Sequence, residues 1–321
     1  MKKSAVVLFN LGGPDSLESV EPFLFNLFCD PDIFNIPFGR KLLARMISRR
    51  RASKVVERYR RIGGSSPINS WTETQRNMLE AALKAEGWEV TVHTAMRYWH
   101  PLIQTVAGDL SAQDYERIVL VPLYPQYSKT TTGSAFNEWK RTFSGSPKVL
   151  SYVPSYHDHP DYVASINGRI DTAISGFPEG ARGDMDILFS AHGIPERLAK
   201  KGDPYSRQIR ETVHAVMGER DFSHPHHLCF QSRVGPVKWL SPSTEDTIRK
   251  LGAENRKHLL VVPISFVSDH IETLFELDVE YREVAETAGI ENYRVMEGLN
   301  DSPIFIGALR DIVLKAMGDG P

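Results

Sequence analysis

The sequence predicts an α/β protein made of two similar, doubly wound Rossmann-like domains, each with a four-stranded parallel sheet, facing each other across a cleft. Three observations support this fold class. Short apolar runs alternate with stretches of helical character, which is typical of parallel sheets. The order of these runs repeats in the two halves of the chain, and so does the punctuation after them. With 321 residues and 41% apolar content, the chain is long enough for two cores.

Eight apolar runs predict the strands. Those of the first half cover Ala5–Leu11, Trp88–Thr94, Arg117–Leu123 and Lys148–Val153. Those of the second half cover Met185–Ala191, His227–Gln231, His258–Ser265 and Tyr293–Glu297.

Helical stretches such as Thr72–Glu86 and Ser206–Met217 separate the strands. We therefore place one domain at residues 1–150 and the other at 151–302. The last segment, 303–321, contains an amphipathic helix that we expect to pack back on the first domain.

Similar turns follow the corresponding strands of the two halves. Strand one runs into Asn10-Leu-Gly-Gly-Pro14 in the first half and into Ala191-His-Gly-Ile-Pro195 in the second. The spacings differ between the halves, so the duplication is structural rather than a sequence repeat. Ligands of open α/β sheets bind beyond the carboxyl ends of the strands, where these polar motifs lie. The cleft between the domains is therefore the expected site.

Composition excludes several classes of protein. The net charge of −2 argues against bulk nucleic-acid binding. The two cysteines, Cys29 and Cys229, are far apart in the sequence, which excludes a disulfide framework and a four-cysteine metal site. This cysteine usage fits a reducing cytoplasm. The first apolar run reaches Gly12-Gly-Pro14 without a cleavage-like region, so we interpret it as a strand rather than a signal peptide. No apolar run approaches the roughly 18 residues of a transmembrane helix.

The segment from Arg40 to Arg61 is strongly basic, with ten Lys or Arg residues against the single acid Glu57. It follows the apolar segment Pro22–Phe38. This combination occurs in membrane-surface lips and in sites for greasy anionic ligands. A core helix with a solvated basic face explains the pattern equally well, so the residues alone leave both interpretations open.

The acidic segment after the strand at 258–265 is the most informative feature. Glu272, Glu276 and Glu280 are spaced four residues apart, so on a helix they form a ladder of carboxylates. Like charges at this spacing repel and weaken a helix. A chain that tolerates this repulsion uses the ladder, most simply for a cation or for protons. Burial and crowding are expected to raise the pKa of some of these carboxylates.

His192 ends the first strand of the second half, with glycine beside it. A hydrogen-bonded structural histidine is one interpretation. The other pairs His192 with Glu272, which follows a neighbouring strand of the same predicted sheet. A histidine and a carboxylate suit a borderline cation such as Fe2+, and the same groups can remove protons.

Other motifs leave alternatives open. Gly12-Gly13 with Pro14 does not match the dinucleotide fingerprint. The segment Thr130–Ser134 either binds a ligand oxygen or caps a helix. Trp239 either stacks on a flat ligand or belongs to the core. We expect exposed surface turns for five clustered histidines: His157, His159, His224, His226 and His227.

Taken together, the chain resembles the ferrochelatases, enzymes that insert Fe2+ into a porphyrin to make haem. The resemblance runs almost end to end and depends on the order and spacing of its motifs. These motifs are Leu11–Pro14, Tyr59–Pro67, Leu123–Ser128 with Thr131–Ser134, Ser190–Pro195, Gly202–Tyr205, Phe230–Pro236 with Trp239–Leu240, and Ser268–Leu274. It implies the class II chelatase fold.

The resemblance implies roles for individual residues. His192 corresponds to the family's metal-site histidine and Glu272 to its acidic partner. Glu276 and Glu280 correspond to a relay for protons or metal on a widened helical turn. Implied porphyrin-contacting positions are Leu11, Arg51, Tyr59, Ser66, Arg97, Tyr98, Ser232 and Trp239.

Arg51 lies in the basic segment, where its guanidinium would pair with a porphyrin propionate. The segment 22–51 corresponds to a lip at the pocket mouth and is expected to make peripheral membrane contact. This favours the interpretation of that segment as a greasy ligand site.

The implied substrates are porphyrin and Fe2+, with no tightly bound cofactor and no nucleic-acid partner. Some family members carry a [2Fe–2S] cluster on cysteines, several of them in a C-terminal extension. This chain has neither those cysteines nor the extension, so we predict no cluster. We expect a cytoplasmic protein loosely associated with the inner face of the membrane. The alternatives are a chelatase of the same fold for another metal or tetrapyrrole, such as cobalt or coproporphyrin, and a non-catalytic iron or tetrapyrrole carrier.

Overall fold

The computed structural model describes residues 3–34, 38–233, 235 and 237–318. The chain forms two compact units, one of Met1–Tyr156 with Asn300–Pro321 and one of His157–Leu299. These boundaries lie near the sequence-based ones, at 150 and 302. Ile36 of the apolar segment, Val234 and Pro236 of one motif, and the end of the predicted C-terminal segment at 319–321 lie outside the described residues.

Each unit contains a four-stranded parallel sheet with the same strand order. In the first, the order is β2 (Val90–Met96), β1 (Ser4–Asn10), β3 (Arg117–Pro122), β4 (Val149–Tyr152). In the second, it is β6 (His226–Gln231), β5 (Asp186–His192), β7 (His258–Pro263), β8 (Asn292–Val295). The predicted α/β fold with two four-stranded parallel sheets is confirmed, and the duplication extends to the topology.

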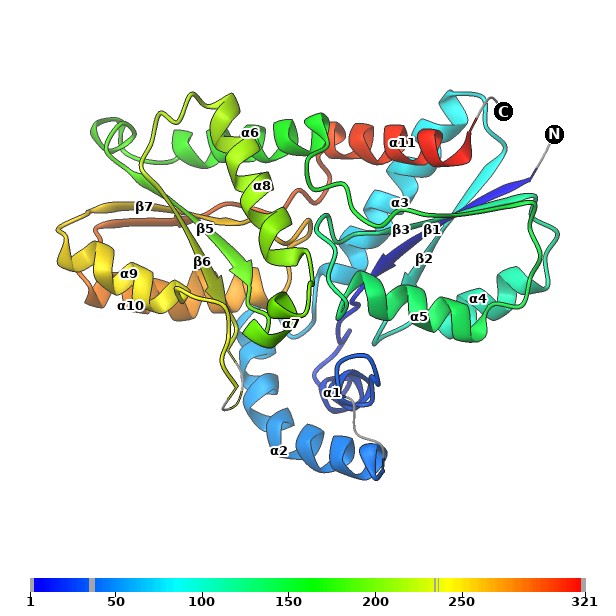
Figure 1. Ribbon diagram of the computed structural model, residues 1–321. Helices are drawn as coiled ribbons and strands as arrows, with labels where there is room; N and C mark the ends of the chain where they lie inside the picture. The colour runs from blue at the N-terminus through cyan, green and yellow to red at the C-terminus, as the bar shows by residue number, and fades with distance from the viewer. Residues whose placement is uncertain (1–2, 35–37, 234, 236, 319–321) are drawn as a thin grey trace. The chain divides into compact units, whose positions relative to one another are not determined.

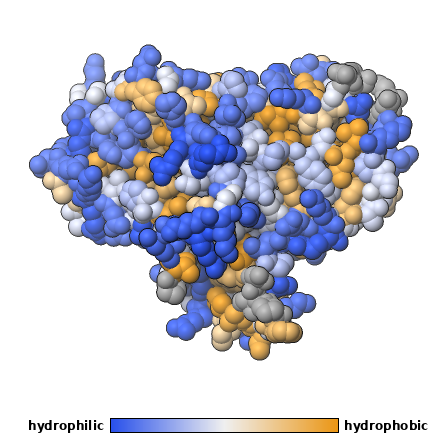
Figure 2. Space-filling model, in the orientation of Figure 1, coloured by the Kyte–Doolittle hydropathy of each residue, from blue (hydrophilic) through white to orange (hydrophobic). Residues whose placement is uncertain are grey.

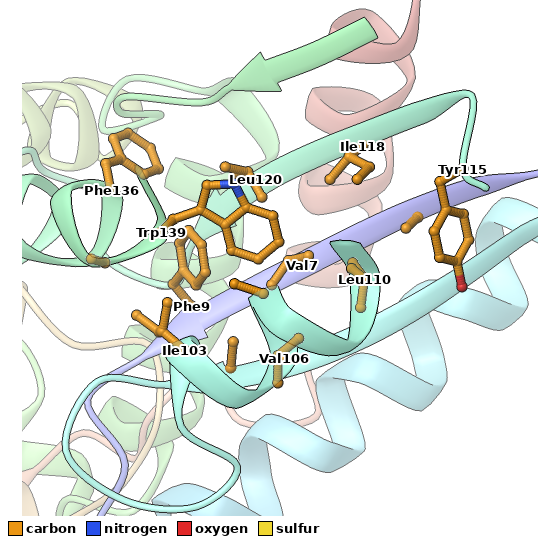
Figure 3. Packing of buried hydrophobic residues seen from close by; sticks show 14 residues of the cluster. Val7, Phe9, Ile103, Val106, Leu110, Tyr115, Ile118, Leu120, Phe136 and Trp139 are labelled. Atoms are coloured by element: carbon orange, nitrogen blue, oxygen red, sulfur yellow. The ribbon is translucent and has the colours of Figure 1, made fainter. Parts of the chain in front are cut away.

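Helices cover both faces of the first sheet. Alternate residues of β1 and β3, among them Val7, Phe9 and Leu120, pack against α4 (Ile103–Ser111) and α5 (Thr132–Thr142), with Trp139 at the centre (Figure 3). Because strand side chains alternate in direction, the intervening residues face α3 (Ile68–Ala85) and α11 (Pro303–Met317). Both faces are thus buried, which explains why the strands are continuously apolar.

The first unit also contains a helical hairpin. It consists of α1 (Val20–Phe28) and α2 (Arg40–Arg61), which pack on each other (Figure 1). It lies on the side of the sheet to which the strand β1 points, so it is close to the carboxyl ends of the strands.

The second sheet is covered in the same way. One face packs against α9 (Thr244–Ala253), α10 (Tyr281–Thr287) and the segment Glu272–Glu280. The other packs against α6 (Pro160–Ser175), which contacts α8 (Tyr205–Glu219). A short 3₁₀ turn (Glu179–Ala181) precedes β5, and α7 (Glu196–Lys200) follows it.

The segment Glu272–Glu280 is a π-helix. It ends with the N–H of Tyr281 donating to the carbonyl of Glu276, an i→i+5 bond. Such helices are rare and occur often at functional sites. Thr273, Phe275 and Leu277 are buried, and Leu277 packs in the core on the second sheet. The spacing of the carboxylates suggested a helix; the wider turn was implied only by the family resemblance.

The expectation of exposed histidine turns is wrong for His157 and His227, whereas His226 is exposed but lies in a strand rather than a turn. His226 and His227 begin β6, and Nε2 of His227 lies 2.8 Å from Oδ1 of the buried Asp186. His157 is mostly buried, with Nε2 2.8 Å from Oε2 of Glu211. In both cases a carboxylate partner makes burial of the imidazole favourable. None of the described helices is long and apolar enough to cross a membrane.

Candidate active site

His192 is the last residue of β5, at the carboxyl edge of the second sheet. Its Nδ1 lies 2.8 Å from Oε2 of Glu272, the first residue of the π-helix that follows β7. The side chain of His192 is 37% exposed and that of Glu272 is 21% exposed. The predicted pair is therefore formed, and a ligand can still reach the imidazole.

The backbone of His192 is held from two sides. Its N–H donates to Oγ of Ser265 at 2.9 Å, and its carbonyl accepts from the buried hydroxyl of Tyr205 at 2.9 Å. Directly after it, a Cβ at Gly193 would lie 2.7 Å from the carbonyl oxygen of Gln231, closer than real Cβ contacts come. Glycine is required here because the turn passes so near the end of β6.

Glu276 lies beside Glu272 on the π-helix and is held by three donors. The backbone N–H of Ser232 donates to Oε1 at 2.8 Å, its hydroxyl donates to Oε2 at 2.6 Å, and the Tyr281 hydroxyl donates to Oε1 at 3.1 Å. The Ser232 hydroxyl also lies 3.4 Å from Oε2 of Glu272. One serine thus links the two carboxylates, and its positive φ of 63° permits this reach.

The charges of this cluster affect one another. Burial alone would lower the pKa of His192, but Glu272 and Glu276 stabilise the imidazolium, and the net effect raises that pKa. Burial would raise the pKa of Glu272, yet His192 lowers it, so this carboxylate is held ionised. Burial and then the charge of Glu272 raise the pKa of Glu276. The expected rise from crowding therefore applies to Glu276 and not to Glu272.

Glu280 and Trp239 are the remaining predicted residues of the second unit, and both belong to segments that also contain or contact residues of the His192 site. Glu280 is the last residue of the π-helix and is half-buried. Trp239 is half-buried, and its backbone forms a bridge with Pro195 in the segment after His192. His270, two residues before Glu272, is buried, and its Nδ1 lies 3.1 Å from the carbonyl of Ser268.

In the first unit, several predicted residues gather at the carboxyl ends of β1 and β2. The Tyr98 N–H donates to the carbonyl of Leu11 at 3.0 Å, and the Ser66 N–H donates to that of Pro14 at 2.8 Å. Ser66 and Tyr98 are buried, and Leu11 is half-buried. A Cβ at Gly13 would collide with Ser66 at 2.5 Å, which explains the glycine before Pro14.

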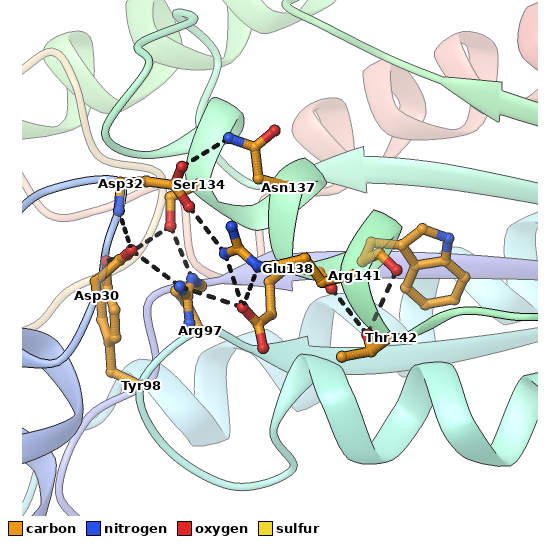
Figure 4. Close-up of polar contacts among 10 residues, drawn as sticks. Asp30, Asp32, Arg97, Tyr98, Ser134, Asn137, Glu138, Arg141 and Thr142 are labelled. Carbon is orange, nitrogen blue, oxygen red and sulfur yellow. Dashed lines mark hydrogen bonds and ion pairs between the residues drawn. The ribbon is translucent and has the colours of Figure 1, made fainter. Parts of the chain in front are cut away.

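Arg51 and Tyr59 lie on α2. The guanidinium of Arg51 lies 5.7 Å from the centroid of the Phe28 ring, and burial followed by the charge of Arg58 lowers its pKa. Tyr59 is buried at 2% exposure. Arg97 lies in a polar network with Asp30, Ser134 and Glu138 (Figure 4).

Sequence reasoning missed the residues that support the site. Tyr205 was visible only as the last residue of the Gly202–Tyr205 motif, and Ser265 only as the end of a strand. Tyr281 and Asp30 carried no signal of their own, since their roles depend on contacts between distant elements.

Within residues 3–34, 38–233, 235 and 237–318, no group of three or more His, Cys, Asp or Glu side chains is arranged to hold a metal ion. His192 and Glu272 are therefore a pair of candidate ligands rather than a complete coordination shell.

Comparison with known proteins decides the family. A family model described as Ferrochelatase matches residues 3–317. The chain belongs to the ferrochelatase family. The ferrochelatase of Nostoc sp. (strain PCC 7120) is 44% identical over 324 residues, which cover 99% of this chain and 83% of that protein. That of Geotalea uraniireducens is 45% identical over 320 residues, covering 98% of each. The predicted family and enzyme class, a ferro-lyase, are confirmed.

Solved structures give the fold. SirB from Bacillus subtilis with Fe3+ has a TM-score of 0.55 at 13% identity, covering 99% of this chain and 96% of that one. CbiX, described as the terminal enzyme for biosynthesis of sirohaem in denitrifying bacteria, has a TM-score of 0.52 at 14% identity, covering 99% and 100%. At these identities the likeness shows the fold alone, and it confirms the class II chelatase fold.

Proposed function

We propose that this ferrochelatase inserts Fe2+ into protoporphyrin IX to form protohaem, at the cluster of His192, Glu272 and Glu276. The observation that carries the assignment is the 2.8 Å contact between His192 Nδ1 and Glu272 in a chain of this family. Porphyrin and Fe2+ are the substrates, and the two cysteines, Cys29 and Cys229, are too few for a four-cysteine iron–sulfur cluster.

The reaction sets three requirements. Fe2+ replaces the two pyrrole protons of the free-base ring, so two protons must leave as two Fe–N bonds form to the deprotonated nitrogens. The flat ring hides its nitrogen lone pairs and must bend. The metal must also shed water before it reaches the ring.

His192 is assigned to the first proton or to the incoming metal. Its Nδ1 is hydrogen-bonded to Glu272. Among the described residues, Nε2 is therefore the ring nitrogen that can bind a ligand. A carboxylate behind an imidazole fixes its tautomer and makes the outer nitrogen more basic. The same nitrogen can accept a pyrrole proton or bind Fe2+, and Glu272 stabilises either positive charge.

Glu276 is assigned to the next step of the relay. The Ser232 hydroxyl touches both Glu272 and Glu276, so it offers a hydrogen-bonded route between them. Glu280, one turn further along the π-helix, would pass protons outward or metal inward. Ser232 was expected to contact porphyrin; its hydrogen bonds support a role in this relay as well.

The first unit is assigned to the porphyrin. Arg51 would pair with a propionate, and Leu11 would contact the ring. Ser66, Tyr59 and Tyr98 are buried, so we assign them to support of that surface rather than to its face. Arg97 is engaged by Asp30 and Ser134 and belongs with them.

The protein would also touch a membrane surface through α2. Phe38, Leu42 and Met46 are spaced four residues apart and are 89%, 77% and 60% exposed. Figure 2 shows apolar surface gathered at this end of the first unit. Leu42 and Met46 lie on the helix that carries the ten basic residues, and Phe38 lies just before it, a pattern suited to anionic lipid. Cytoplasmic residence beside a membrane, where a greasy substrate is available, is part of this proposal.

The test is a panel of metals and tetrapyrroles under anaerobic conditions. Fe2+, Co2+ and Ni2+ are each mixed with protoporphyrin IX, coproporphyrin and a sirohydrochlorin, and metallation is followed by absorption. We expect many turnovers per chain with Fe2+ and protoporphyrin IX. Turnover with only another pair would reassign the substrate, and binding without turnover would indicate a carrier.

A further inference from the structure

A buried charged junction fixes the α1–α2 hairpin to the first sheet. Asp30, two residues beyond the end of α1, has no exposed side-chain surface. Its Oδ2 accepts from the Tyr98 hydroxyl at 2.6 Å and from the Ser134 hydroxyl at 2.5 Å, and its Oδ1 lies 3.0 Å from Nη2 of Arg97 (Figure 4). A single carboxylate thus joins the hairpin, the end of β2 and the start of α5.

A second tier surrounds this junction. Asp32 accepts from Asn137 at 2.8 Å and pairs with Arg141 at 2.9 Å, both on α5. Glu138 lies between the two arginines, 2.8 Å from Arg141 and 3.5 Å from Arg97. On the α1 side, the Asn26 amide donates to the carbonyl of Tyr98 at 3.0 Å.

The hairpin depends on these polar contacts. Its helices pack on each other, and among the described elements neither packs extensively against another helix or strand of the unit. A helical pair whose backbone makes few contacts with its sheet is positioned in large part by specific side-chain contacts such as these. The buried carboxylate of Asp30 is central among them, because its removal leaves the Tyr98 and Ser134 hydroxyls without their acceptor and Arg97 without its nearer carboxylate.

We propose that Asp30 is a positioning residue for porphyrin binding, acting with Tyr98 and Ser134 to set the place of the α1–α2 hairpin and hence of Arg51. The inference rests on the proposed function, because it takes the hairpin as the porphyrin-binding lip. In this arrangement Arg97 neutralises Asp30 rather than pairing with a propionate, because its Nε is hydrogen-bonded to Ser134 and its Nη2 is paired with Asp30.

The experiment compares Asp30→Asn, Ser134→Ala and Tyr98→Phe with the wild type. The control is Asp109→Asn, an exposed aspartate on α4. Porphyrin affinity is measured by fluorescence without iron, and KM for porphyrin, KM for Fe2+ and kcat are measured separately. Amide hydrogen exchange over residues 20–61 reports on the hairpin without substrate.

We expect the dissociation constant and KM for porphyrin to rise about fivefold or more, as for loss of a hydrogen bond to a charged group, while KM for Fe2+ stays unchanged. Exchange over 20–61 should quicken and exchange over 157–299 should not. If Asp30→Asn fails to fold, the milder Ser134→Ala and Tyr98→Phe decide. Folded variants with wild-type porphyrin affinity and wild-type exchange would overturn the inference. A wild type that binds no porphyrin would instead overturn the proposed function.

Discussion

Nδ1 of His192 lies 2.8 Å from Oε2 of Glu272, although 80 residues separate them in the chain. The contact forms because β5 and β7 are neighbours in a parallel sheet, so their carboxyl ends lie at the same edge. It joins a basic group of raised pKa to a carboxylate held ionised, which suits an exchange of protons for a divalent metal.

Glu272→Gln tests the carboxylate of this pair. The amide keeps the shape but removes the charge that stabilises a positive His192. We expect iron insertion to fall by about 10²- to 10⁴-fold, the range for loss of a proton-transfer partner, with porphyrin affinity unchanged. Steady-state rates and porphyrin fluorescence measure the two effects. Glu286→Gln, on the exposed side of α10, is the control and should behave as the wild type.

Gly193→Ala tests the tight turn after His192. The added methyl group would lie 2.7 Å from the carbonyl of Gln231, so β6 and the His192 turn must move apart. We expect a loss of about 1–3 kcal/mol in the free energy of unfolding together with reduced insertion. Gly218→Ala on α8, where a Cβ meets nothing within 4 Å, is the matched control. Equal stability and activity of the two variants would refute this explanation.

The fold was largely predictable because buried parallel strands are short apolar runs, and all eight runs are strands. The order of turns after them also indicated the duplicated topology. The edge placement of His192 and Glu272 followed from that topology alone. A parallel sheet brings strand ends together whatever the sequence between them.

The contacts that support the site were not predictable. Ser232, which donates two hydrogen bonds to Glu276, has a positive φ, a conformation that composition does not reveal. The sequence around Asp30 does not distinguish it from other loop aspartates, because its role follows only from its contacts with residues after β2 and on α5. His227 was assigned to an exposed turn because the partner that buries it, Asp186, lies on the adjacent strand. Such contacts arise from tertiary packing and leave no local pattern.

Asp186 should make the second unit sensitive to acid. Burial would raise its pKa, but His227 and Arg256 lower it below the ordinary 3.8. A carboxylate whose pKa is lower in the folded state than in the unfolded state stabilises the fold at pH values above its unfolded-state pKa. This stabilisation is lost as the pH falls below about 4, towards the folded-state pKa. We expect Asp186→Asn to lower the free energy of unfolding at pH 7 by roughly 1–3 kcal/mol, given the partial exposure of Arg256.

Urea unfolding of both proteins between pH 7 and pH 3 checks this. The difference between wild type and Asp186→Asn should shrink as the pH falls below about 4. A difference that stays constant over that range would show that the charge of Asp186 is not the source of the stability.

The apolar stripe on α2 predicts membrane binding. Replacing both Leu42 and Met46 by serine should leave stability within about 0.5 kcal/mol, because both side chains are exposed. Sedimentation with anionic lipid vesicles should show weaker binding of this variant than of the wild type. Ile304→Ser, at another exposed apolar residue, is the control and should bind normally. Equal binding of all three would remove α2 from the membrane contact.

The most direct test of the central claim is an anaerobic comparison of the wild type with His192→Ala. Each protein is mixed with excess protoporphyrin IX and Fe2+ in detergent, and the change from free-base to metalloporphyrin absorption is followed while porphyrin binding is measured by fluorescence. Loss of the imidazole removes the proposed metal ligand and proton acceptor. We therefore expect multiple turnovers by the wild type, and retained binding without insertion by His192→Ala. Insertion by His192→Ala at the wild-type rate would contradict the assignment of this site.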